Sequence, residues 1–334
     1  MLSRRDALRW LAGGVAAWKL GACARTTEAA REVTGSPPRT VPLYYSAEYT
    51  LAAQSFDTTR KAAWVAADLE KRPIAGVELR APASLTAAEL ARVHHAHYVE
   101  AVRTGTPREL AESQGFRWDA GLWTMVCATN GGAVAAALAA MRGGVAGSLS
   151  SGLHHARADE GRGFCTFNGL ALASRRAQAA GARRILIVDL DAHCGGGTHS
   201  LVGEDEGVRI LDVSVNAFDH YTPTGRHTLD VVRQAADYLP QVRVRLDELG
   251  DETFDLCLYN AGMDPHEGCP IGGLRGIDAA ILAERETLVF EWARKRSLPV
   301  AFVLAGGYIG DLTQEALVDV HRLTLSAAAR SVAG

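Results

Sequence analysis

The sequence lacks the features of several large classes of protein. Its 334 residues carry 35 basic and 38 acidic side chains, a formal net charge of −3. This balance, with no basic stripe, argues against direct nucleic-acid binding. Six cysteines without dense spacing do not form the pattern of a disulfide framework. The absence of any run of 18 or more apolar residues argues against a transmembrane span. What is present, 48% hydrophobic and 22% charged residues, is typical of a globular domain.

The first 24 residues, "MLSRRDALRWLAGGVAAWKLGACA", differ from the rest. Arg4 and Arg5 precede a modest apolar segment and then small residues, which is the order of a bacterial export signal of the twin-arginine type. "LGAC", ending at Cys23, resembles a lipoprotein cleavage box and so predicts a lipid anchor as one outcome. A cytoplasmic protein with an amphipathic N-terminal helix is the alternative, and Lys19 interrupts the apolar segment. Residues 25–40 are polar and predict a linker to a single domain at 41–334.

That domain alternates short apolar runs with helical patterns. The apolar runs lie at 144–149, 185–190, 209–215, 255–260 and 299–304. Segments such as "IDAAILAERETLVFEWARKR" between them have helical spacing. Strands that are apolar on both faces and separated by helices predict a parallel β-sheet flanked by helices on both faces. The fold class is therefore α/β.

Polar side chains follow four of these runs. They are His154 and His155, then Asp189, Asp191 and His193, then Asp264, and finally Tyr308. Open parallel sheets bind ligands beyond the carboxyl ends of their strands. We therefore predict a functional site at this edge of the sheet.

Residues 189, 191 and 193 alternate along an extended chain, so their side chains can project from one side. Buried charges are costly unless they are paired or bind a metal. Two of these side chains with Asp264 would offer one imidazole and two carboxylates, leaving a metal position open for water. Zn²⁺ and Fe²⁺ both suit this set. Taken alone, the pattern is equally typical of loop caps and surface charges.

The other polar residues would supply acid–base chemistry. Histidine titrates near neutrality, so His154 or His155 could accept a proton from water and return one to a leaving nitrogen. Tyr308 follows Gly306 and Gly307, a pair that allows a sharp turn and would present the hydroxyl to a developing oxyanion. Each feature alone is also common in ordinary cores and loops.

Together the motifs carry a resemblance. "LARVHHAHYVEAV", "SGLHHARADEGRGFCTFN", "VDLDAHCGGGTH", "YNAGMDPHEGCPIGGL" and "LAGGY" occur in this order. Over roughly residues 41 to 325 the sequence resembles the histone deacetylases and acetylpolyamine amidohydrolases, most of all the class IV histone deacetylases. The resemblance implies the single-domain arginase/deacetylase fold and zinc-dependent removal of an acyl group, usually acetyl, from lysine side chains. An acetylpolyamine or a small N-acetylated metabolite is the alternative substrate, and an inactive acyl-amine binding module is the alternative function.

The resemblance also implies roles for individual residues. Asp191, His193 and Asp264 would bind the metal; His154 and His155 would transfer protons; Tyr308 would polarise the acyl carbonyl. Asp189 would orient His154 and, with Ser214, help form a structural K⁺ site. Phe164 and, less strongly indicated, Tyr221 would form opposite walls of the substrate tunnel.

Two positions depart from the family's pattern. Cys194 stands where His or Gln is usual. Gly196 stands where an Asp or Asn usually contacts the second histidine, so we expect His155 to lack a carboxylate partner and to be less basic than in relatives. His199 could substitute for the missing group.

Two further functional hypotheses have weaker support from the residues. The glycine-rich "CGGGTH" could cradle a phosphate at a helix N-terminus, but it lacks the spacing of dinucleotide-binding and P-loop motifs. Cys165, Cys194 and Cys257 could suggest a thiol nucleophile, although small apolar packing beside the strands is favoured.

Overall fold

The computed structural model describes residues 40–53 and 56–333. The predicted leader, Cys23 and all of the predicted linker except residue 40 lie outside the described residues, so export and lipidation stay predictions. The described residues form one compact unit.

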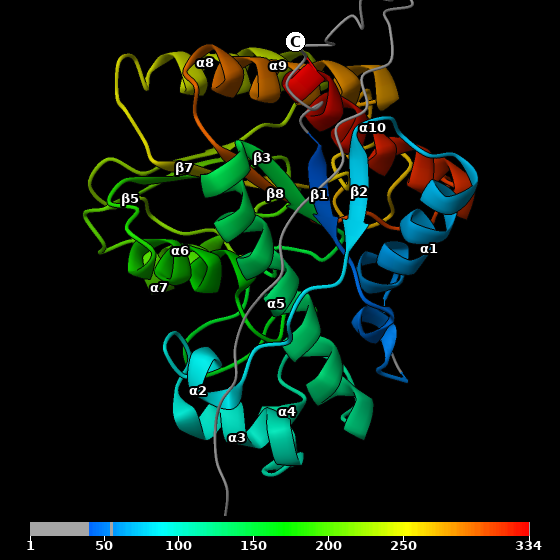
Figure 1. Cartoon of the computed structure of the whole chain (residues 1–334), viewed down its shortest axis with the longest axis vertical. Helices are drawn as coiled ribbons and strands as arrows, with labels where there is room; N and C mark the ends of the chain where they lie inside the picture. The colour runs from blue at the N-terminus through cyan, green and yellow to red at the C-terminus, as the bar shows by residue number, and fades with distance from the viewer. Residues whose placement is uncertain (1–39, 54–55, 334) are drawn as a thin grey trace, which may run out of the picture. The chain divides into compact units, whose positions relative to one another are not determined.

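A parallel sheet of eight strands forms the centre of the described chain (Figure 1). Its strands are β1 (Val41–Tyr44), β2 (Val77–Arg80), β3 (Val145–Ser148), β4 (Ile185–Asp189), β5 (Val208–Ser214), β6 (Thr228–Val231), β7 (Leu256–Ala261) and β8 (Val300–Leu304). Their order across the sheet is β2-β1-β3-β8-β7-β4-β5-β6, with every neighbouring pair parallel. The α/β fold predicted from the alternating apolar runs is confirmed.

Helices cover both faces of the sheet. One face packs on α1 (Asp57–Lys71), α8 (Ala235–Asp247), α9 (Ala279–Lys295) and α10 (Gln314–Ala333), and the other packs on α5 (Ala120–Gly143), α6 (Gly169–Ala179) and α7 (Gly196–Val202). Strand β4 shows why both faces are apolar: Leu186 and Val188 enter the first cluster, while Ile185 and Ile187 enter the second. The short elements η1 (Ala47–Thr50), α2 (Ala87–Leu90), α3 (Ala96–Thr104) and α4 (Arg108–Ala111) complete the described chain.

The five predicted apolar runs each match a strand to within one residue at either end, whereas β1, β2 and β6 are additional. Strands β2 and β6 are four-residue edge strands whose side chains are at least partly exposed. An edge strand needs no continuous apolar run, which explains why the pattern of buried strands missed them.

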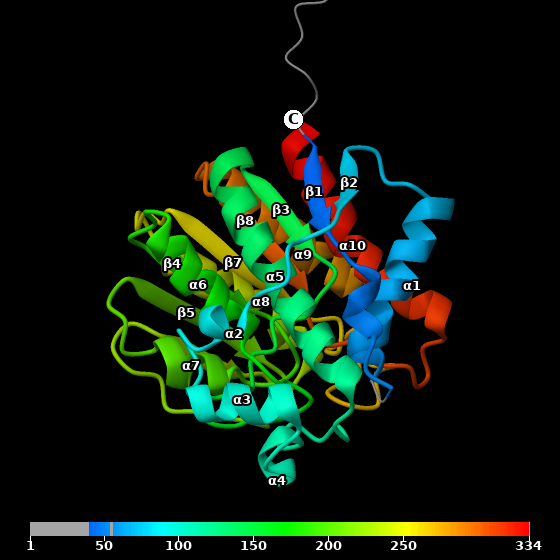
Figure 2. The same cartoon turned by 60° about the horizontal axis from the view of Figure 1, so that its bottom comes forward.

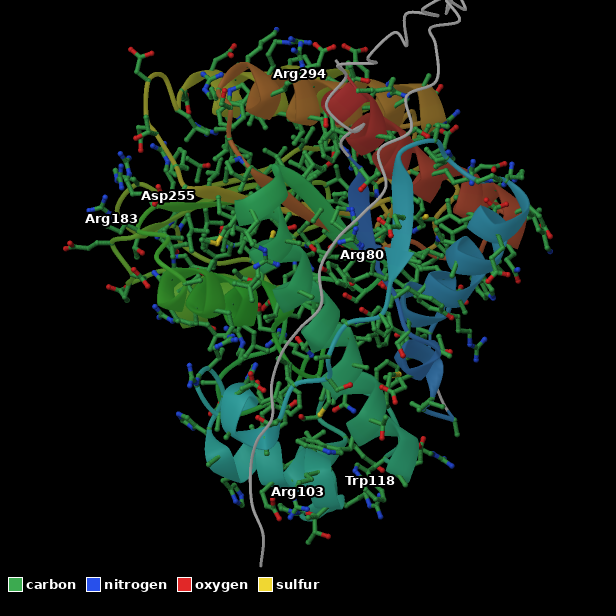
Figure 3. All side chains as sticks on the ribbon, viewed as in Figure 1. Arg80, Arg103, Trp118, Arg183, Asp255 and Arg294 are labelled. Atoms are coloured by element: carbon green, nitrogen blue, oxygen red, sulfur yellow. The ribbon has the colours of Figure 1, made fainter. Side chains whose placement is uncertain are left out.

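Helix α5 is long and apolar enough to cross a membrane by length and composition alone. However, 78% of its most apolar window is buried inside the fold, as in the core helix of a globular domain. In contrast to the buried apolar side chains of α5, charged side chains such as those of Arg183, Asp255 and Arg294 lie at the periphery (Figure 3).

The sheet order explains where the functional residues meet. Strands β3, β8, β7 and β4 are consecutive neighbours and run parallel, so their carboxyl ends share one edge. Figure 2 shows these strands side by side at the centre of the sheet. The loops that follow them carry the polar residues singled out from the sequence.

Candidate active site

Asp191, His193 and Asp264 form a buried cluster at this edge. One ligand atom from each residue lies within 4.8 Å of the other two. The Nδ1 atom of His193 is 3.1 Å from Asp191 Oδ1 and 3.2 Å from Asp264 Oδ2. The predicted metal-ligating set is therefore brought together by the ends of β4 and β7.

Backbone groups hold the two carboxylates in place. Gly306 N donates to Asp191 Oδ2 at 2.7 Å, and Ala192 N donates to Asp264 Oδ1 at 3.0 Å. The remaining oxygen, Asp264 Oδ2, is buried and accepts no hydrogen bond. A Cβ at residue 306 would stand 2.1 Å from this oxygen, so only glycine lets the loop after β8 pass so close. An orphaned carboxylate oxygen beside an imidazole fits a divalent cation.

The pKa values in this cluster reflect its concentrated negative charge. Burial and the nearby Asp191 carboxylate raise the pKa of Asp264 to about 6 against the opposing pull of His193. Burial alone would lower the pKa of His193, but Asp191 and Asp264 outweigh it and raise the pKa to about 10. The site therefore favours a positive charge between the two carboxylates.

His154 and His155 lie beside this cluster on the loop after β3, with ring centroids 4.0 Å apart. His154 Nδ1 donates to Asp189 Oδ2 at 2.7 Å, and Asn260 Nδ2 donates to the other oxygen of Asp189 at 2.8 Å. The Nε2 atom of His154 is 3.5 Å from Asp191 Oδ1. Asp189 thus contacts His154 as the sequence predicted.

The expectation that His155 lacks a carboxylate partner is wrong. Its Nδ1 donates at 3.0 Å to Oδ2 of Asp219, which lies in the loop between β5 and β6. His199 does not take this place; its Nε2 lies 3.2 Å from Thr224 Oγ1. Asp219 was missed because no spacing rule links position 219 to position 155, and only the loop conformation brings them together.

His155 is nevertheless poorly basic, as expected, but for other reasons. Burial and the positive charge of His154 lower its pKa to about 4, despite the opposing effect of Asp219. For His154, burial acts in the same direction, but Asp189 and Asp191 outweigh it and raise the pKa to about 10.

Tyr308 faces the same buried pocket. Its lining comprises Thr58, Ser151, Leu153, His154, His155, Gly163, Phe164, Cys165, Asp191, His193, Gly306 and Tyr308. Burial and the carboxylates of Asp264 and Asp191 raise the pKa of Tyr308 well above its usual range. The hydroxyl therefore stays protonated at neutral pH and can donate a hydrogen bond.

The aromatic rings at the site differ in part from the prediction. Phe164 lines the pocket, but Tyr221 does not and instead stacks on His199 with centroids 4.3 Å apart. Phe218, three residues earlier in the same loop, packs against the site instead, with its ring 5.0 Å from that of His155 and 6.0 Å from that of His193. The ring that contacts the histidines is thus three residues from the predicted one.

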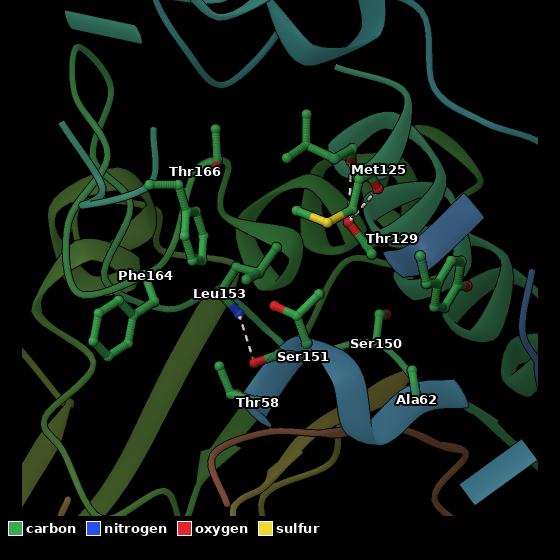
Figure 4. Close-up of a pocket in the computed structure, with 13 residues that line it drawn as sticks. Thr58, Ala62, Met125, Thr129, Ser150, Ser151, Leu153, Phe164 and Thr166 are labelled. Atoms are coloured by element: carbon green, nitrogen blue, oxygen red, sulfur yellow. Dashed lines mark hydrogen bonds between the residues drawn. The ribbon is translucent and has the colours of Figure 1, made fainter. Parts of the chain in front are cut away.

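An apolar cavity adjoins this pocket (Figure 4). The two share Thr58, Ser151, Leu153 and Phe164, and the cavity also has Tyr49, Phe116, Met125 and Val126 in its lining. Its surface suits an apolar group rather than a charged one.

Ser214 lies on β5 and Asp189 on the neighbouring strand β4. Both lie close to a buried carboxylate that was not predicted from the sequence. This is Asp212, the register partner of Asp189. It accepts hydrogen bonds from Ser214 Oγ at 2.6 Å and from Gly195 N at 2.8 Å. Burial and the Asp189 carboxylate raise its pKa well above the usual range.

The geometry does not support the two weaker hypotheses, a phosphate-binding glycine loop and a thiol nucleophile. At the start of α7, Gly195 N and Gly197 N donate to Asp212 and Asp219, so these groups are not available to a phosphate. Burial raises the pKa of Cys194 and of Cys257 to about 12 and that of Cys165 further still, which disfavours a thiolate nucleophile.

Comparison with known proteins identifies relatives. The family described as Histone deacetylase domain matches residues 55–323. An uncharacterized protein of Picosynechococcus sp. is 35% identical over 247 residues, which cover 72% of this chain and 81% of that protein. Histone deacetylase 2 of Arabidopsis thaliana is 32% identical over 191 residues, which cover 54% of this chain but only 48% of that protein.

Two solved structures share the fold. The HDA15 HD domain aligns with a TM-score of 0.72 and 20% identity over 87% of this chain and 90% of that one. The acetylpolyamine aminohydrolase from Burkholderia pseudomallei aligns with a TM-score of 0.71 and 20% identity over 86% of this chain and 98% of that one. The architecture is the arginase/deacetylase fold, and the chain belongs to the histone deacetylase family.

Proposed function

We propose that this chain is a metal-dependent amidohydrolase that removes an acyl group, typically acetyl, from a lysine side chain or a related N-acyl amine. One observation carries the proposal. Asp191 and His193, which cluster with Asp264, line one pocket together with the histidine pair and Tyr308. A pure binding module would need no metal-ligating set with an open position.

Asp191, His193 and Asp264 would hold the metal, Zn²⁺ or Fe²⁺. When bound, such an ion lowers the pKa of water and polarises an acyl carbonyl. Asp189 and Ser214 would contribute to a structural K⁺ site, next to Asp212.

The chain's own groups would handle the protons. Because His155 Nδ1 donates to Asp219, its Nε2 carries the lone pair and can accept a proton from the attacking water. The same Nε2 can then pass that proton to the leaving amine nitrogen, so water and amide give a carboxylic acid and an amine. The Tyr308 O–H would donate to the oxygen on which negative charge develops.

Two aromatic rings near the histidine pair would position the amine carrier. Phe164 and Phe218 offer apolar surfaces for a methylene chain, and the adjoining cavity offers an apolar surface for the acyl tail. Acyl-lysine polypeptides, acetylpolyamines and small N-acetylated metabolites share this chemistry.

The test is a panel of acetyl-lysine peptides, acetylated polyamines and N-acetyl amino acids, assayed by release of acetate. Zn²⁺-loaded and Fe²⁺-loaded protein should turn over at least one carrier class, and chelator-stripped protein should turn over none. Binding of these ligands without release of acetate by any metal form would favour the inactive binding module instead.

A further inference from the structure

The second histidine of the pair is held by a carboxylate from an unexpected part of the chain. Asp219 Oδ2 lies 3.0 Å from His155 Nδ1, and both side chains are buried. Asp219 lies in the β5–β6 loop, 64 residues after His155, whereas Asp189 comes from a strand end. In the family's pattern the corresponding group stands at the position of Gly196.

This carboxylate is fixed from several sides. Gly197 N donates to its Oδ2 at 3.0 Å, and Arg157 Nη2 donates to its Oδ1 at 2.5 Å. Arg162 Nε lies 3.7 Å from the same Oδ1. Donors on both oxygens prevent the carboxylate from rotating away from His155.

The backbone explains why residue 196 is glycine. A Cβ there would stand 2.3 Å from the main-chain oxygen of Asp219 and 2.8 Å from its Cγ. Asp219 itself has a φ of 58°, a left-handed conformation that Asp tolerates better than most residues. The space that an aspartate at 196 would need is thus already occupied by Asp219.

We propose that Asp219 is the positioning residue for His155 and that the β5–β6 loop has taken over a role that relatives assign to the loop after β4. The carboxylate keeps the proton on Nδ1 and leaves the Nε2 lone pair directed away from it. Arg157 in turn holds Asp219, and Gly196 makes room for it. The kinetic consequences rest on the proposed deacylase function, but the tautomer of His155 does not.

The first test is Asp219→Asn in the Zn²⁺-loaded full chain. We expect kcat to fall about 10–100-fold, as for other groups that orient a functional histidine, with little change in KM or bound metal. In ¹H–¹⁵N spectra the hydrogen-bonded Nδ1–H proton of His155 should move upfield or vanish. The matched control is Asp230→Asn, which removes a carboxylate that Arg245 Nε and Nη2 bind at 2.6 and 2.8 Å on strand β6.

The second test is Gly196→Ala, which removes no charge but should push Asp219 away. Its kcat and His155 resonance should follow those of Asp219→Asn, whereas Gly143→Ala, where a Cβ meets nothing within 4 Å, should resemble wild type. If either test variant fails to fold, Arg157→Gln serves instead, because it loosens the carboxylate without removing it.

An Asp219→Asn protein that is folded and metal-loaded, with wild-type kcat and an unchanged His155 resonance, would overturn the proposal. If the wild-type chain shows no deacylation at all, the proposed function fails while the resonance still decides the role of Asp219.

Discussion

His154 and His155 are adjacent in the sequence and equally buried, each with 4% of its surface exposed, yet their pKa values shift in opposite directions. Burial lowers both. Asp189 and Asp191 overcome that effect at His154, where the pKa is about 10. At His155, burial and repulsion by His154 outweigh Asp219, which Arg157 also binds, and the smaller effect of Asp191, so the pKa is about 4. The comparison shows that the local balance of charge, rather than burial, separates the two imidazoles.

The largest effect is expected from loss of the metal, because the two histidines have no function in turnover without it. Asp264→Ala removes the carboxylate that carries the unpartnered oxygen, so bound metal and turnover should disappear together. An ion contributes several kcal/mol to such a reaction, so a loss of roughly 10⁴-fold in kcat/KM is expected. Metal analysis and acetate release on the same samples check this. Full activity in a metal-free Asp264→Ala protein would contradict the assignment.

The two histidines themselves provide the next test. His155→Gln should lower kcat on the order of 10³-fold because the neutral imidazole acts as the base. His154→Gln should lose less, on the order of 10-fold to 100-fold, because this ring, held by Asp189, acts by supporting the neighbouring carboxylates. Single-turnover rates for both variants, with metal content held equal, measure the difference. Equal losses would mean that the two rings share one role.

Stability of the metal-free protein should depend on pH in opposite ways through the two rings. The folded pKa of His154 exceeds its unfolded value of about 6.5, so its stabilisation is full below that pH and is lost as pH rises to about 10. The folded pKa of His155 lies below about 6.5, so its stabilisation holds above that pH and is lost as pH falls to about 4. The effect is on the order of 5 kcal/mol for His154 and on the order of 3 kcal/mol for His155.

Denaturant unfolding of the metal-free protein from pH 4 to 10 measures how the free energy of unfolding depends on pH. The stability gap between wild type and His154→Gln should narrow above pH 6.5, whereas the gap for His155→Gln should narrow below it. Parallel curves for the two variants would show that their folded pKa values are alike.

The smallest effect concerns the loop that carries Asp219. Phe218 is 41% exposed and its ring packs against His155, so Phe218→Ala should raise KM about 3-fold to 10-fold, in line with the roughly 1 kcal/mol of an aromatic contact. Tyr221→Phe, a change in the ring stacked on His199, should leave KM unaltered. Reversed KM effects would restore Tyr221 as the tunnel wall.

Local patterns in the sequence were enough to predict much of the fold and the gathering of the site. Apolar runs such as 185–190 specify buried strands. Because these strands are parallel, Asp191, Asp264 and Tyr308 follow strand ends at one edge of the sheet, regardless of loop conformation. The half-exposed edge strands β2 and β6 have no such run and could not be found in this way.

The sequence by itself therefore determined the residues at strand ends, because the period of a β-strand and the direction of a parallel sheet place them. Only the tertiary structure decided which carboxylate faces His155, which ring packs against His155 and why Gly196 is glycine. Those contacts join loops that are far apart along the chain, and their geometry depends on a left-handed turn at Asp219 and on the donors that hold it. Loop conformation follows from packing against the rest of the fold, which no local spacing encodes.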